Sequence, residues 1–211
     1  MPVSEGQENI FTSNLDTAST TNPVINLEPL DTTPPAVTIN SPKEKQYLHS
    51  DIIPVDYQIT DESATKETLY FDSVLFEENQ IDGFFQELGI HQLKIDALDK
   101  FNNSSTVTFE IIATLDSLYR DIGRAYSLGW IKNTRTRDTA LNLVNNVRNW
   151  YNKYELLKQT NPVMAKLVKT KLISLLATLK TSLNLFEKLR VITHQANQLI
   201  FKQIEYIINN L

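Results

Sequence analysis

Two alternating runs near the middle of the chain predict a β-hairpin. In residues 88–99, Leu93, Ile95 and Ala97 fall on one side of an extended chain, and Lys94 and Asp96 fall on the other. This two-residue period is typical of a strand with one buried face. The polar segment Asp99–Asn103 follows and predicts a turn that reverses the chain. The second strand then also has one apolar face, formed by Val107, Phe109 and Ile111.

Shorter strand-like segments precede the hairpin, at the spacing of an all-β domain. Pro54 lies near the start of one of them, where a missing N–H is tolerated. Together with the hairpin they predict about seven strands between Pro35 and Ala113. The segments are Ala36–Asn40, Ile53–Ile59, Thr68–Ser73, Val74–Glu77 and Gln80–Gln86.

After Thr114 the apolar positions recur about every 3.6 residues, which predicts helices. Gly129 suits the left-handed position that ends a helix. Asn161 followed by Pro162 predicts a helix start, because Asn caps helices and Pro is tolerated in the first turn. Four helices with short connections are expected: from Leu115 to Gly129, about Thr136–Gln159, from Pro162 past Phe186, and from a cap at Thr193 onward.

The helical part contains a weak internal similarity. Residues 125–131 and 186–192 each end one helix, place an isoleucine in the connection and precede another helix. The two isoleucines, Ile131 and Ile192, are therefore expected to hold equivalent places in two helix–turn–helix units. Helices joined in this way are stable only when their apolar stripes are buried on one another.

Residues 1–33 differ in composition from the rest of the chain. They are rich in Ser, Thr, Asn, Asp and Pro, and their apolar residues are sparse and aperiodic. Such a segment cannot offset its own ordering entropy, so it is predicted to be a flexible linker. The two prolines Pro34 and Pro35 then stiffen the chain ahead of the first strand, where a missing N–H is tolerated at a sheet edge.

The net charge of −5 is unevenly divided. Residues 1–114 carry 5 basic and 19 acidic side chains, whereas residues 115–211 carry 15 basic and 6 acidic ones. This asymmetry predicts two modules, which could also attract each other within the chain. The basic side chains are spread over several helices, so an anionic wall polymer or a protein partner is favoured and nucleic acid is not expected.

Several classes of chemistry are excluded or disfavoured. The chain has no cysteine, which rules out disulfides, thiolate metal sites and a cysteine nucleophile. The aliphatic run Leu172–Leu179 is too short to span a bilayer, so no membrane insertion is expected. The first residues lack the features of a signal peptide, so any secretion signal is expected to lie outside this sequence or to have been removed.

The hairpin resembles the last hairpin of bacterial Ig-like domains. The shared pattern is Gly89-x-His91-x-Leu93-x-Ile95-x-Ala97-x-Asp99, with Leu88 directly before Gly89 and Phe101-Asn102 where Ala-Gly is usual. Asp31-x-Thr33-Pro34-Pro35 resembles the segment before such domains. Residues 115–211 resemble, less specifically, the FIVAR-like helical modules of bacterial surface proteins. These resemblances imply an extracellular or cell-surface protein whose modules serve interaction, spacing or wall association.

One polar cluster is a candidate calcium site. In an Ig-like sandwich, the start of the first strand, the loop after the second strand and the final hairpin turn lie at one end. These places hold Asp31, Asp61, Asp99 and Asn102, whose hard oxygens suit calcium. The alternative is that Asp and Asn are simply good turn formers there.

No catalytic constellation is found, so no enzymatic activity and no organic cofactor are expected. His91 is predicted to have a structural role through a hydrogen bond back to a loop, and His49 and His194 show no metal-binding spacing.

We therefore expect an α+β multidomain chain: a linker over residues 1–33, an all-β Ig-like sandwich over 34–114 and an antiparallel four-helix bundle over 115–211. The expected function is a non-enzymatic structural or interaction module of a bacterial extracellular or cell-surface protein, which spaces and presents neighbouring domains or mediates adhesion. The alternative is an accessory polysaccharide- or wall-binding module of a secreted multidomain hydrolase.

Overall fold

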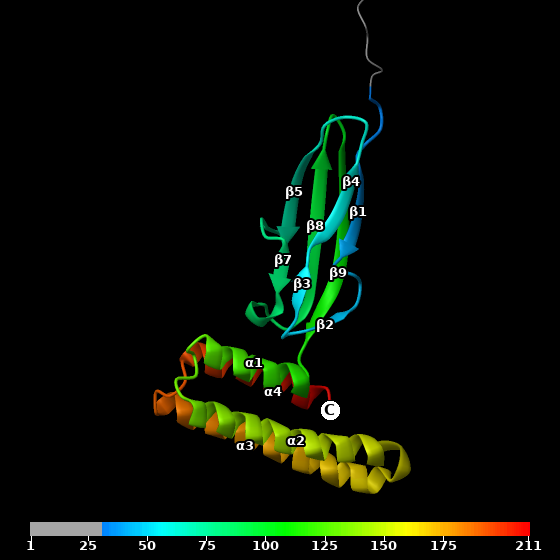
Figure 1. The fold of residues 1–211 in the computed structure, drawn as a ribbon. Coiled ribbons are helices and arrows are strands. Elements are labelled where there is room, and N and C mark those ends of the chain that lie inside the picture. The colour runs from blue at the N-terminus through cyan, green and yellow to red at the C-terminus, as the bar shows by residue number, and fades with distance from the viewer. Residues whose placement is uncertain (1–30) are drawn as a thin grey trace, which may run out of the picture. The chain divides into compact units, whose positions relative to one another are not determined.

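The chain changes from strands to helices between Ile112 and Leu115, where the hydrophobic period changes. In the computed structural model, which describes residues 31–211, nine strands precede four helices, so the fold is of the α+β type (Figure 1). The predicted linker lies, up to residue 30, outside the described residues, and Thr32–Leu211 form one compact unit. The helices within residues 31–211 each lack the length or the hydropathy that a bilayer-spanning segment requires.

The nine strands are short, except for the last two. Their bounds are β1 Ala36–Ser41, β2 Gln46–Leu48, β3 Ile52–Pro54, β4 Asp56–Thr60, β5 Lys66–Phe71, β6 Val74–Leu75, β7 Gln80–Asp82, β8 Gly89–Leu98 and β9 Asn102–Ile112. The largest sheet has the order β2-β9-β8-β5-β6, with β2 parallel to β9 and the other pairs antiparallel. β1–β4 and β3–β7 form two further antiparallel pairs.

The predicted hairpin is confirmed as β8 and β9. The two strands pair without interruption from Gly89 opposite Ile111 to Leu98 opposite Asn102. The predicted apolar faces lie in the interior, and their residues are Leu93, Ile95, Ala97, Val107, Phe109 and Ile111. Side chains of β1 and β4 pack against the same core, so the pair β1–β4 and the five-stranded sheet share one interior: Val37, Ile39, Tyr57 and Ile59.

The described part of the chain has nine strands where about seven were predicted, and two of the predicted strands differ in extent. The strand expected over Ile53–Ile59 is interrupted at Val55, because β3 pairs with β7 while β4 pairs with β1. The strand expected over Gln80–Gln86 ends at Asp82 and continues as a 3₁₀ turn, Gly83–Phe85. This turn brings Gly83 so close to the neighbouring backbone that a Cβ there would lie 2.8 Å from the carbonyl oxygen of His49.

Each helix begins next to a capping residue, and the second helix begins two residues before the predicted Thr136. Their bounds are α1 Leu115–Ser127, α2 Thr134–Thr160, α3 Pro162–Lys188 and α4 His194–Asn209. Thr114, Asn133, Asn161 and Thr193 each accept a hydrogen bond from a backbone N–H of the first turn, which satisfies a donor that has no partner within the helix. Buried side chains of all four helices form one apolar core.

The two predicted isoleucine connections meet in the structure. Ile131 and Ile192 form an isolated antiparallel β-bridge, and both side chains are buried. The N–H of Lys132 donates to the carbonyl oxygen of Val191 at 2.9 Å, and the N–H of Thr193 donates to that of Trp130 at 2.8 Å. The bridge therefore ties the α1–α2 connection to the α3–α4 connection.

The strand region and the helices share a packed junction. Helices α1 and α4 lie next to the strands, and the longer α2–α3 hairpin lies on their far side (Figure 1). Phe84, which follows β7, is fully buried and belongs to the helical core. Arg124 of α1 pairs through both terminal nitrogens with the carboxylate of Asp82, which fixes α1 against the end of β7.

Candidate functional site

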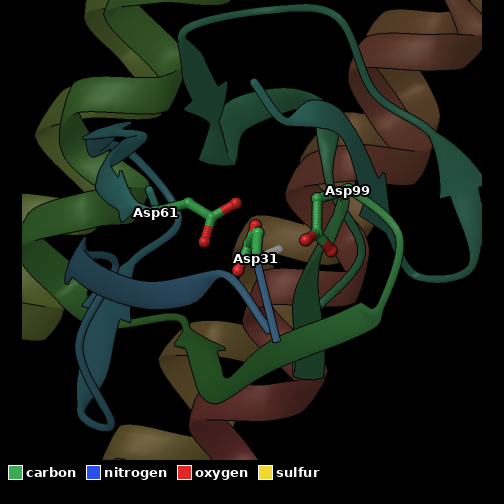
Figure 2. Close-up of side chains that lie close together, drawn as sticks. All are labelled: Asp31, Asp61 and Asp99. Atoms are coloured by element: carbon green, nitrogen blue, oxygen red, sulfur yellow. The ribbon is translucent and has the colours of Figure 1, made fainter. Parts of the chain in front are cut away.

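Three of the four predicted calcium ligands lie together. Asp31 precedes β1, Asp61 directly follows β4, and Asp99 lies in the turn between β8 and β9. One carboxylate oxygen from each lies within 4.8 Å of the others, and the three side chains converge in Figure 2. It is the only such group of potential metal ligands within residues 31–211.

Hydrogen bonds use part of this oxygen set. The hydroxyl of Ser63 donates to Oδ2 of Asp61 at 3.0 Å and lies 3.5 Å from Oδ2 of Asp99. Oδ1 of Asp99 accepts the backbone N–H of Phe101 at 2.6 Å, as expected of a turn-forming aspartate. Asp99 therefore stabilises the turn through Oδ1, as the alternative interpretation expects, and its Oδ2 faces Ser63.

Asn102 is not part of the three-carboxylate group. It begins β9 opposite Leu98, and its side chain is exposed. Its neighbour Asn103 instead donates to the carbonyl oxygen of Pro35 at 2.7 Å, which ties the start of β1 to the hairpin turn.

The charges of the group favour a cation. Two like unit charges 4 Å apart repel by about 4 kcal/mol at an effective dielectric constant of about 20. With one oxygen from each, the three carboxylates supply three of the six to eight oxygens that calcium takes, so water or carbonyl oxygens would have to complete the shell. Calcium binding at Asp31, Asp61 and Asp99 therefore stays a prediction.

The prediction is tested by thermal unfolding. If calcium binds only the folded state, calcium at about 100 times its Kd should raise the melting temperature by about 5–10 °C. Asp99→Ala should abolish this increase, because it removes one of the three carboxylates. Asp138→Ala, which changes an exposed aspartate of α2, should leave the increase intact. A melting temperature that does not change between micromolar and millimolar calcium would leave the three aspartates as turn residues.

A second polar cluster lies buried at the junction between strands and helices. Nδ1 of His49 lies 2.7 Å from Oδ2 of Asp121 in α1, and Nε2 of Gln203 in α4 donates to the same oxygen at 2.9 Å. All three side chains are almost fully buried, with relative exposures of 3%, 0% and 0%. Because the carboxylate accepts both bonds, Nδ1 of His49 carries a proton and the amide of Gln203 has a fixed orientation.

Sequence reasoning missed this cluster, although a signal for it exists. Asp121 falls on the apolar stripe of α1 beside Leu118 and Ile122, and Gln203 falls beside Ile204 on the stripe of α4. A polar residue on a buried stripe needs a buried partner. The partner, His49, lies 72 positions before Asp121 along the chain, too far for local patterns to reveal.

Further polar contacts connect the strands to α4. The ammonium group of Lys202 lies 2.6 Å from both carboxylate oxygens of Glu87, and the hydroxyl of Tyr206 donates to Oε1 of Glu110 at 3.2 Å. Burial, and then the charge of Glu110, raise the pKa of Tyr206 above its ordinary value. The phenol therefore remains a donor at neutral pH.

The other two histidines make local contacts. Nε2 of His91 lies 2.9 Å from the carbonyl oxygen of Glu87, which confirms the predicted bond to a loop, and Nδ1 lies 2.7 Å from Asp72. The ring also stacks on Phe71 with centroids 5.4 Å apart. His194 begins α4, and its Nδ1 lies 2.7 Å from Oε1 of Glu187, near the end of α3.

Comparison of the chain with protein-family models, curated proteins and solved structures gives no match.

Proposed function

We propose that the chain is a rigid, non-enzymatic structural and interaction module of a bacterial extracellular or cell-surface protein. In this proposal an Ig-like sandwich and a four-helix bundle act as one body that spaces and presents neighbouring domains or mediates adhesion. The other domains of the same polypeptide are its constant neighbours, and a cell-wall polymer or a protein is the external partner. The hairpin pattern and the helical similarity described above are the basis for this setting.

The observation that carries the proposal is the closed junction between strands and helices. A spacer holds its neighbours at a defined distance only if its own parts do not hinge. Here the buried contact of His49 with Asp121, the paired contacts of Arg124 with Asp82 and the burial of Phe84 all act against hinging. The connection from β9 to α1 is only two residues long and contains neither Gly nor Pro.

The assignment of an Ig-like sandwich and a four-helix bundle is supported by the packing of the side chains as well as by the sequence patterns. The pair β1–β4 and the five-stranded sheet contribute side chains to one core, as two facing sheets of a sandwich do. All four helices likewise contribute to one core, as in a bundle.

Rigidity can be measured by spin-label distances, because the chain has no native cysteine. Labels at Thr106→Cys on β9 and Thr139→Cys on α2, both at exposed positions, should give one narrow distance distribution. The matched control inserts Gly-Gly-Gly after Ala113 and should broaden it. If the distribution of the chain without the insertion is as broad as that of the control, the two regions hinge and the spacer proposal is wrong.

A second role, as an accessory polysaccharide-binding module of a secreted hydrolase, is favoured by one specific observation. A cavity with aromatic and amide walls opens at the same junction.

A further inference from the structure

A small cavity of about 190 Å³ lies where the strand region meets α4. Both regions contribute to its lining, so it exists only while the junction is closed. The volume is below the range of about 300–1,000 Å³ that holds drug-sized ligands, and is nearer to that of a single sugar ring. Its principal lining residues are His49, Phe85, Trp130, Gln195, Gln198 and Gln203.

Gln203 forms a buried part of the lining. The amide nitrogen of Gln203 is committed to Asp121, which fixes the amide and directs its oxygen elsewhere. Within residues 31–211 this Oε1 atom is buried and has no hydrogen-bond partner. The atom is too buried to contact a molecule in the cavity, so the exposed part of the lining supplies the polar contacts with a ligand.

Aromatic rings form another part of the lining. The ring of Trp130 lies 5.4 Å from that of Phe84 and 6.1 Å from that of Phe85, centroid to centroid. Phe85 is 54% exposed, although a large aromatic side chain next to an apolar core would ordinarily be covered. Exposed aromatic surface of this kind suits a ligand that has an apolar face.

The rim supplies hydrogen-bonding groups without net charge. Gln195 and Gln198 are exposed on the first turns of α4, and each amide offers both donors and an acceptor. The only full charges on the rim, those of Glu87 and Lys202, neutralise each other in an ion pair. The cavity therefore favours neither an anion nor a cation.

We propose that this cavity binds one ring of a neutral saccharide. A pyranose ring combines an apolar C–H face, which suits an exposed aromatic ring such as that of Phe85, with hydroxyl groups that both donate and accept. Its hydroxyl groups meet the exposed amides of Gln195 and Gln198. This ligand class specifies the second role above and does not depend on the spacer role, which the spin-label distances test separately.

The experiment is a titration with short neutral oligosaccharides of glucose, xylose, mannose and N-acetylglucosamine. Trp150→Phe leaves Trp130 as the only tryptophan, so that its fluorescence reports on the cavity. At least one sugar should shift this fluorescence saturably, with a Kd on the order of 1 mM or lower. Isothermal calorimetry of the unaltered chain should give the same affinity.

Matched variants locate the binding. Phe85→Ala and Gln198→Ala change exposed residues, and each should weaken binding on the order of tenfold. Phe101→Ala removes an equally large and similarly exposed ring from the β8–β9 turn, so it should have no effect. The proposal is overturned if no sugar of the panel binds, or if binding survives Phe85→Ala and Gln198→Ala unchanged. A preference for anionic over neutral oligosaccharides would also contradict it.

Discussion

Phe84→Ala is expected to destabilise the strand region and the helices together, by about 3–5 kcal/mol. Phe84 follows β7, yet its side chain is fully buried within the helical core, where its ring lies against Trp130. Truncation leaves a cavity at the junction, because the rigid neighbours on both sides cannot close it fully. The loss therefore falls on the unit Thr32–Leu211 and not on one region alone.

The measurement combines denaturant unfolding with hydrogen exchange. Both tryptophans, Trp130 and Trp150, report on the helical region, and the exchange of β8 and β9 amides reports on the strands. Both signals should shift by the same free energy. The matched control is Phe85→Ala, which makes the same change one residue later at an exposed position and should cost less than about 1 kcal/mol. A variant in which only the helical signal shifts would mean that the two regions unfold independently.

The helices were predictable from sequence because their signals are local. A cap such as Thr193 acts on backbone groups two or three residues away, and a stripe such as that of α3 repeats within one helix. The same holds for the hairpin β8–β9, whose alternation and turn are contained in one continuous stretch. The bridge between Ile131 and Ile192 was anticipated only as two equivalent positions, and their direct contact depends on the packing of all four helices.

Elements that depend on distant partners were not predictable in this way. The strand β2 has only three residues and is held by its parallel pairing with β9, more than 60 positions away. The interruption at Val55 follows from a change of pairing partner, from β7 to β1, which an alternating pattern does not reveal.

The candidate sites also differ in how far the sequence alone could reveal them. The gathering of Asp31, Asp61 and Asp99 could be suggested from sequence, because the expectation that their loops share one end of the strand region was sufficient. Asn102 was included because of its residue type and its neighbourhood in sequence, and the three-carboxylate group does not contain it. The cluster around Asp121 needed the relative placement of strands and helices, which no single segment specifies.

Asp121→Ala is expected to cost about 3–5 kcal/mol of unfolding free energy, the loss typical of removing one partner from a buried polar pair. Without the carboxylate, Nδ1 of His49 and Nε2 of Gln203 lose their acceptor, and both side chains are almost fully buried. Asp116→Ala is the matched control on the same helix. The side chain of Asp116 is 69% exposed and pairs with Arg148, so its removal should cost less than about 1 kcal/mol.

A double-mutant cycle between Asp121→Ala and His49→Ala then separates the pair from general loss of packing. If the two residues act as a unit, the double variant should be less destabilised than the sum of the single variants, by about 0.5–3 kcal/mol. Replacing His49, Asp121 and Gln203 together with leucine should recover much of the loss, because an apolar junction leaves no donor without an acceptor. Strict additivity of the single variants, with Asp121→Ala no worse than Asp116→Ala, would show that the buried cluster does not hold the strands and helices together.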